Sequence, residues 1–90
     1  MQLSLASLAH HTFAIVDIET NGMSAAYGSI IEIGIIRVED GRIVDTYQTL
    51  LRPERGIPAM ITSLTGITNA DLESAPTFEA EATRIRELLA

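Results

Sequence analysis

The first half of the chain alternates apolar runs with turn residues, a pattern typical of β-strands. Residues 12–18 and 29–38 are rich in β-branched side chains, so both are expected to form buried strands. Asp40 and Gly41 give the sequence signal of a hairpin, and residues 43–51 are expected to return as an antiparallel strand. The pattern predicts a three-stranded antiparallel meander.

The second predicted strand is apolar at both of its alternating sets of positions. Ile31, Ile33 and Ile35 share one face, and Ile30 and Ile36 share the other. Strands with this pattern lie in the middle of a sheet that is covered on both sides. We therefore expect residues 29–38 to be the central strand, with other elements covering both of its faces.

Helical spacing replaces strand spacing after Pro53. Pro58 is expected at the first position of a short helix that runs through Leu64, with Gly66 at its C-terminal cap. A second short turn is expected to begin at Thr68. A longer helix is expected from residues 76–77 onward, because apolar residues recur there on one helical face. Those residues are Phe78, Ala82, Ile85 and Leu89.

Composition is that of one small globular domain with an aliphatic core. Hydrophobic residues make up 47% of the 90 positions and aromatic residues only 4%. The absence of cysteine excludes disulfides, thiolate metal sites and thiol catalysis. No apolar run approaches the roughly 20 residues of a membrane helix, and residues 1–9 lack the features of a signal peptide. We expect a cytoplasmic protein with no membrane partner, and one domain over residues 1–90.

The net charge limits the partners of the protein. Twelve acidic and six basic side chains give a formal charge of −6. This charge opposes unassisted binding to a polyanion, because binding to phosphates depends largely on basic side chains. A nucleic-acid partner would therefore need bridging cations.

Two carboxylates end the first predicted strand. Asp17 and Glu19 are two positions apart, so they share a face and can converge on one Mg²⁺ or Mn²⁺ ion. Without a cation, two such anions repel one another. An Asp-x-Glu triplet alone is a weak signal that is also typical of a solvated strand end. Gly22, which suits a tight turn, and the second buried strand strengthen the metal-site interpretation.

Four blocks of sequence together resemble one known family. They are Asp17-Ile18-Glu19-Thr20-Asn21-Gly22, Ile30-Ile31-Glu32-Ile33-Gly34, Leu64-Thr65-Gly66-Ile67-Thr68 and Ala75-Pro76-Thr77-Phe78. From about Phe13 onward, their order and spacing resemble the N-terminal half of the DEDD-type, DnaQ-like 3′→5′ exonucleases. This family includes the proofreading epsilon subunit of bacterial DNA polymerase III. The resemblance implies a ribonuclease-H-like α/β fold, truncated here to the meander and its following helices, with strands over about residues 12–51 and helices over about 57–90.

The resemblance also implies roles for individual residues. Asp17 and Glu19 match the first exonuclease motif and would be catalytic ligands of two Mg²⁺ or Mn²⁺ ions. Glu32 matches a commonly acidic position; we expect its carboxylate to be buried, to bond a backbone donor or an arginine, and at most to support the metal ligands. Further positions match contacts to the terminal nucleotide: Ile18, Thr20, Asn21, Gly22, Ile67 and Thr68. For Ile67 and Thr68, a packed loop with a helix cap at Thr68 is an equally compatible structural interpretation.

The other carboxylates of the family, and its water-activating His or Tyr, have no match in the chain. His10 and His11 lie roughly 20 Å from Asp17 at about 3.3 Å per residue, so we expect them to be exposed and too distant to act. The remaining acidic residues of the second half are expected to be helix caps or solvent-facing helix charges. These are Asp71, Glu79 and Glu81.

The leading hypothesis is a fragment of a 3′→5′ exonuclease that hydrolyses phosphodiester bonds at DNA 3′ ends, preferably single-stranded, and is inactive alone. Its partner would be a DNA polymerase or a repair complex. The alternative is a non-catalytic assembly or protein-binding module on the same fold. A small α+β domain in which the triplet is only a polar strand end is a third interpretation. The strand that carries Asp17 is expected to be a bare edge, which favours a homodimer through this edge.

Overall fold

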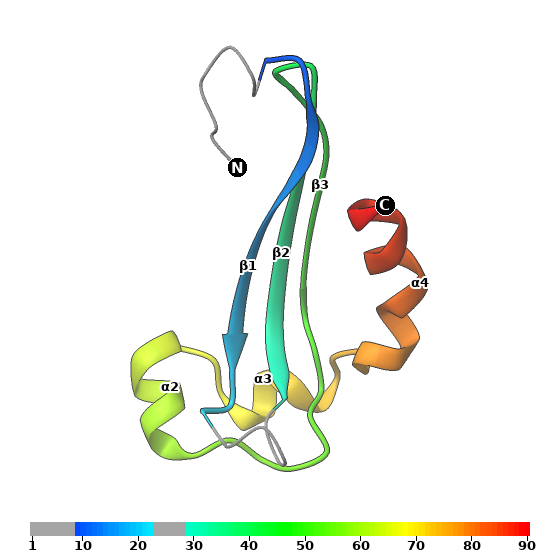
Figure 1. Ribbon diagram of the computed structural model, residues 1–90. Helices are drawn as coiled ribbons and strands as arrows, with labels where there is room; N and C mark the ends of the chain where they lie inside the picture. Colours follow the sequence, from blue (N-terminus) through cyan, green and yellow to red (C-terminus); the bar gives the residue numbers. More distant parts are fainter. Residues whose placement is uncertain (1–8, 23–28) are drawn as a thin grey trace.

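The fold of the computed structural model is a three-stranded sheet with three helices, described over residues 9–22 and 29–90. The strands are β1 (Thr12–Thr20), β2 (Ile30–Glu39) and β3 (Arg42–Leu50). The helices are α2 (Ala59–Thr65), α3 (Asn69–Glu73) and α4 (Phe78–Leu89). In Figure 1, α4 runs alongside the sheet, while α2 and α3 lie at the end where β1 finishes. Residues 1–8 lie outside the described residues. They make up most of the segment that is expected to lack a signal peptide.

The sheet has the order β1-β2-β3, and both neighbouring pairs are antiparallel. The predicted meander and its central strand are therefore confirmed. The hairpin between β2 and β3 turns at Asp40 and Gly41, whose φ angles of 50° and 76° are both positive. Two consecutive residues with positive φ are the requirement of a type I′ turn, which explains the Asp-Gly pair at this position.

The two core clusters of the described residues lie on one side of the sheet. Ile31, Ile33 and Ile35 of β2 are 0%, 3% and 1% exposed and pack against residues of the helices and the loops that join them. The expectation that both faces are covered is wrong for the described residues, because Ile36 is only half-buried and Ile15, opposite it on β1, is 52% exposed. All three helices follow the meander in sequence, and the buried face of β2 is the one that they cover.

Helix α4 packs with only part of the predicted face. Ile85 is buried and Ala82 is half-buried, as predicted. Leu88 is also buried, whereas Phe78 and Leu89 are 41% and 50% exposed. Polar contacts to the sheet explain this orientation, because the Arg37 guanidinium donates a 2.9 Å hydrogen bond to the Leu88 carbonyl. Apolar spacing alone could not predict this anchoring.

A hydrogen bond also corrects the expectation for Glu81. Its carboxylate accepts a 2.6 Å hydrogen bond from the Tyr47 hydroxyl of β3, so Glu81 is half-buried and faces the sheet instead of solvent. Nearby, Arg84 and Asp45 form a 2.7 Å ion pair across the same helix–strand boundary. Helix α4 is therefore held on the sheet by polar contacts at its margin as well as by its apolar residues.

The short helices begin and end close to the predicted residues. Pro58 is predicted as the first residue of α2 but is its N-cap, so the helix begins one residue later, at Ala59; Gly66 is its C-cap with φ 80°. Thr68 caps α3 in a reciprocal capping box with Asp71, so both cap predictions are confirmed. Thr77 caps α4 through a 3.2 Å hydrogen bond from the Ala80 amide. Among the described residues, no helix has the length and apolar character needed to cross a membrane.

Candidate functional site

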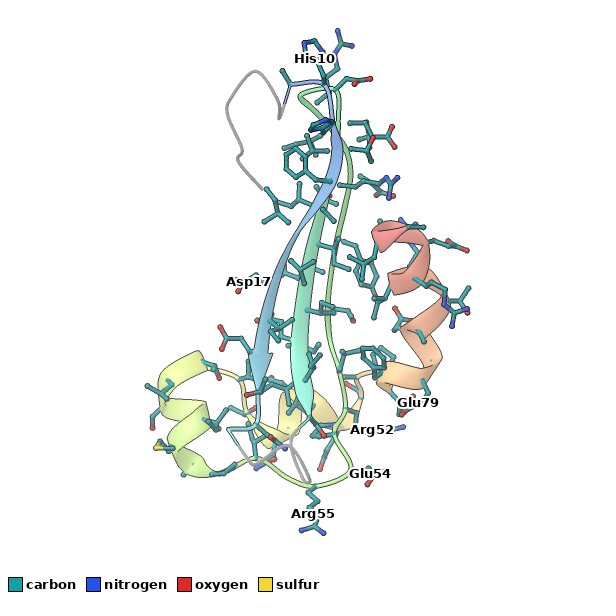
Figure 2. The ribbon with its side chains drawn as sticks, viewed as in Figure 1. His10, Asp17, Arg52, Glu54, Arg55 and Glu79 are labelled. Carbon is teal, nitrogen blue, oxygen red and sulfur yellow. The ribbon has the colours of Figure 1, made fainter. Side chains whose placement is uncertain are left out.

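Asp17 and Glu19 lie on the same face of the edge strand β1, as predicted. In the pairing with β2, Asp17 is opposite Gly34 and Glu19 is opposite Glu32. This is the face of the sheet that α4 does not cover, because the buried residues of α4 pack against Ile33 and Ile35, which point the other way. Figure 2 shows Asp17 beside β1 on the side away from α4.

The two carboxylates lack protein partners that would neutralise them. Within the described part of the chain, neither side chain makes a hydrogen bond or an ion pair. Asp17 is exposed and Glu19 is half-buried, so the carboxylate oxygens of both residues are accessible to a ligand. Oxygen donors of this kind are what Mg²⁺ and Mn²⁺ prefer, and the pair therefore fits a hard divalent cation.

An open depression of about 400 Å³ adjoins Asp17 on this face. It lies over Gly34, whose missing side chain leaves room between β1 and β3. Its lining residues come from all three strands and are Ile15, Asp17, Gly34, Ile35, Ile36, Thr46, Tyr47 and Gln48. Asp17 thus lies beside a space large enough for a hydrated ion or a small group of a ligand.

Glu32 has a hydrogen-bond partner, but one of a different type from that expected. Its carboxylate accepts a 3.2 Å hydrogen bond from the side-chain amide of Gln48, in place of a backbone or arginine donor. Glu32 is half-buried. Sequence reasoning missed Gln48, because its position beside Glu32 depends on the β2–β3 register, which places Gln48 opposite Gly34.

The turn after β1 is held by its own polar groups. The Thr20 hydroxyl accepts a 3.2 Å hydrogen bond from the Gly22 amide, and the Asn21 side chain accepts one of 3.2 Å from the Ser29 amide. Asn21 is 1% exposed, whereas Thr20 and Gly22 are exposed. Gly22 has a φ of 73°, and an added Cβ would lie 2.7 Å from the Ile61 Cδ1 atom of α2. Glycine is therefore required here by both conformation and packing.

The other predicted nucleotide contacts lie apart from the pair. Ile18 alternates with the carboxylates and points to the opposite face of β1. Ile67 is 7% exposed and packs in the core with Ile31 and Leu72, while Thr68 caps α3. Their contacts with a nucleotide, like the other predicted roles at this site, stay predictions.

Other titratable residues do not join the pair. His10 and His11 are exposed, and Figure 2 shows His10 at the far end of the sheet from Asp17. In residues 9–22 and 29–90, no three His, Cys, Asp or Glu side chains gather closely enough to hold a metal ion. The described residues therefore supply two carboxylates at this position and no nearby imidazole.

Shifted pKa values occur at contacts of the helices. Burial, and then the hydrogen bond to Glu81, raise the pKa of Tyr47 to about 12. The hydrogen bond from Arg84 lowers the pKa of Asp45, and the Thr68 backbone amide lowers that of Asp71. These shifts follow from contacts that hold helices in place, so they mark structural links.

Comparisons with known proteins agree with this arrangement. The sequence model of the exonuclease family RNase T matches residues 14–90. The chain is 41% identical over 73 residues to a PolC-type DNA polymerase III of Thermotoga petrophila, covering 81% of this chain and 5% of the relative. It is 41% identical over 78 residues to the 3′-5′ exonuclease DinG of Staphylococcus epidermidis, covering 87% and 9%.

Solved structures show the same fold. The nuclease domain of 3′hExo, a DEDDh family member bound to rAMP, superposes with a TM-score of 0.71 at 27% identity. The match covers 87% of this chain and 43% of that domain, and the chain spans less than a tenth of the two polymerase and DinG relatives. The fold is thus the ribonuclease-H-like α/β fold of DEDDh exonucleases. Since the family match takes in the carboxylate pair and nearly all of the described structure, the chain belongs to the RNase T exonuclease family.

Proposed function

We propose that the chain carries the first metal-binding motif of a 3′→5′ exonuclease that acts on DNA 3′ ends, with single strands preferred. The observation that supports this most directly is the pair of same-face carboxylates on β1, Asp17 and Glu19, which have no partner among residues 9–22 and 29–90. A PolC-type DNA polymerase III and a DinG exonuclease are among the relatives, which favours DNA and a polymerase or repair complex as partners. For a protein with such partners we infer a cytoplasmic location.

In this proposal, the residues of the chain bind and orient the ions and the end of the substrate. Two Mg²⁺ or Mn²⁺ ions, when bound, would activate water and stabilise the leaving 3′ oxygen of the phosphodiester. Asp17 and Glu19 would hold them from the open face of β1. The exposed turn residues Thr20 and Gly22 continue from the same strand and would lie against the terminal nucleotide. The cations would also offset the formal charge of −6 where the phosphate approaches.

We further propose that residues 1–90 are one partial exonuclease domain and are inactive alone. The support is the donor count, because the described residues supply two carboxylates at the pair and no third His, Cys, Asp or Glu close enough to complete a metal site. The match to 43% of the 3′hExo nuclease domain agrees with a half-domain. Completing the site then requires groups from another segment.

Calorimetric titration with Mn²⁺ tests the first part of the proposal. Wild type should bind Mn²⁺, and Asp17→Asn and Glu19→Gln should each lose most of the affinity. Glu54→Gln is the matched control, because Glu54 is exposed in the loop after β3 and lies away from Asp17 (Figure 2). Absence of Mn²⁺ binding by wild type would contradict the metal site.

A chimaera tests the catalytic part. Residues 14–90 would replace the matching segment of the 3′-5′ exonuclease DinG relative, and a 5′-labelled single-stranded oligonucleotide would report shortening from the 3′ end. We expect a ladder of shortened products from DNA that Asp17→Asn abolishes, and no products from the 90-residue chain alone. A chimaera that folds, binds Mn²⁺ and leaves DNA intact would contradict exonuclease function. Cleavage of RNA but not DNA would contradict the proposal that DNA is the substrate.

A specific observation also favours assembly as a second function. Strand β1 is an edge strand of the described sheet, and Ile15, Val16 and Ile18 on it are 52%, 46% and 45% exposed. Exposed apolar edges pair readily with other strands, so β1 is the surface through which we infer a homodimer or another protein contact. A monomer over the micromolar range in light scattering would contradict the homodimer.

A further inference from the structure

On the face that carries Asp17, side chains form rows across the three strands. One row contains Glu19 and Glu32, and the next contains Asp17, Gly34 and Gln48. Gly34 contributes no side chain, so the position between Asp17 and Gln48 is open, and the depression lies there. Asp17 and Gln48 therefore face one another across an open position that Glu32 adjoins.

The hydrogen bond from Gln48 determines where the Glu32 carboxylate lies. Because an ionised carboxylate can only accept, the NH₂ group of Gln48 must face Glu32, and the amide oxygen must point elsewhere. Glu32 is directly opposite Glu19, and like charges in that position on neighbouring strands repel. The 3.2 Å bond to β3 holds Glu32 away from Glu19 and leaves Glu19 to act with Asp17.

The polar atoms around the open position suit the water shell of a cation. Magnesium ions release their waters reluctantly and usually keep several when protein-bound, so those waters need acceptors near the carboxylate ligands. The Gln48 amide oxygen and the second Glu32 oxygen accept no hydrogen bond from the described residues. Both belong to side chains beside the Gly34 position, so they are suitable acceptors for waters on an ion at Asp17.

We propose that Gln48 and Glu32 are positioning residues for the divalent cation of Asp17 and Glu19. Gln48 fixes the Glu32 carboxylate, and together they hold the waters of the cation at the Gly34 position. This inference rests on the proposed function, because it requires a cation at the carboxylate pair. Neither residue is a direct ligand, in agreement with the absence of a three-residue metal cluster in the described structure.

The test compares Gln48→Leu and Glu32→Gln with the matched control Thr49→Val. Thr49 is next to Gln48 on β3 but lies opposite Ile33, on the other face of the sheet, and does not line the depression. Each titration would use Mn²⁺ alone, and circular dichroism would follow thermal unfolding in EDTA and in saturating Mn²⁺. Gln48→Leu and Glu32→Gln should each raise the Kd for Mn²⁺ about 10-fold, the lower end of the range for residues that support metal ligands. Thr49→Val should leave Kd unchanged.

Two further readouts separate this role from simple bracing of the sheet. In EDTA, Glu32→Gln should melt no lower than wild type, because one of two opposed charges is removed, while the rise in melting temperature caused by Mn²⁺ should shrink. The double variant should bind within about threefold of the weaker single variant, because the two residues act as one unit.

The outcomes distinguish this proposal from the proposed function. One outcome is that wild type binds Mn²⁺, Asp17→Asn does not, and both Gln48→Leu and Glu32→Gln keep the wild-type Kd. This outcome would overturn the positioning role but leave the metal site in place. A lower melting temperature of Gln48→Leu in EDTA with an unchanged Mn²⁺-induced shift would mean that Gln48 only braces the sheet. If wild type does not bind Mn²⁺, both proposals fall.

Discussion

Tyr47 joins β3 to α4 through a contact that high pH should break. Its hydroxyl donates a 2.6 Å hydrogen bond to the Glu81 carboxylate. Burial and this neighbour raise the pKa of Tyr47 from 10.0 to about 12. Ionisation would remove the donated proton and place a phenolate beside a carboxylate. The folded state therefore favours the neutral phenol and should lose stability when Tyr47 ionises.

The direction and size of this effect follow from the two pKa values. Because the folded value lies above the unfolded one, the contribution to the free energy of unfolding is complete below about pH 10 and is lost as pH rises through about 12. The whole difference would correspond to about 2.7 kcal/mol at 1.36 kcal/mol per pKa unit. Tyr47 is partly exposed, and solvent screening reduces the expected loss to about 1–2 kcal/mol.

The composition leaves few other side chains that could ionise in the pH range of the assay. The six basic side chains are all arginine, and the chain has no cysteine, so Tyr27 is the other side chain that titrates near pH 10. Urea unfolding at steps between pH 9 and pH 12 should show the loss of about 1–2 kcal/mol in wild type. Tyr47→Phe should begin lower by a similar amount and vary little with pH. Tyr27→Phe, which leaves Tyr47 in place, should retain the decline.

Two results would refute the reasoning about Tyr47. One is a phenolate absorbance titration, taken as the difference between wild type and Tyr47→Phe, in which the folded protein ionises near pH 10. The other is a Tyr47→Phe variant that loses the same stability as wild type between pH 10 and pH 12. Either result would mean that the contact with Glu81 does not hold α4 on the sheet in solution.

The remaining predictions concern packing and backbone conformation. Leu88 is 1% exposed, so Leu88→Ala should lower the free energy of unfolding in urea by about 2–3 kcal/mol. Leu89 is 50% exposed, so Leu89→Ala should lower it by less than about 1 kcal/mol. Equal losses would contradict the observed orientation of α4. Gly22→Ala should lower stability by about 2 kcal/mol and Gly66→Ala by about 1 kcal/mol, because an added Cβ contacts a neighbouring helix only at Gly22; thermal melts that rank them in reverse would refute this. Thr68→Ala should cost about 1 kcal/mol and speed amide exchange in α3, and unchanged exchange would argue against the capping box.

Much of the local structure could be predicted from the sequence. The Asp40-Gly41 turn, the cap at Thr68 and the same-face placement of Asp17 and Glu19 depend on residue type and on the two-residue repeat of a strand. The resemblance of four sequence blocks led to the family that the comparisons confirm. These features survive in the structure because each depends on neighbours a few positions away.

Other features required the tertiary structure, because they depend on how separate elements meet. The β2–β3 register brings Gln48 to Glu32. Contacts of Arg37 and Tyr47 with α4 set the orientation of that helix. As a result, Leu88 is buried in place of Leu89. The sequence by itself determined the strands, the turns and the carboxylate pair, since local sterics and alternation specify them. Only the tertiary structure decided which face of the sheet stays open beside that pair, because packing between distant segments selects the covered face.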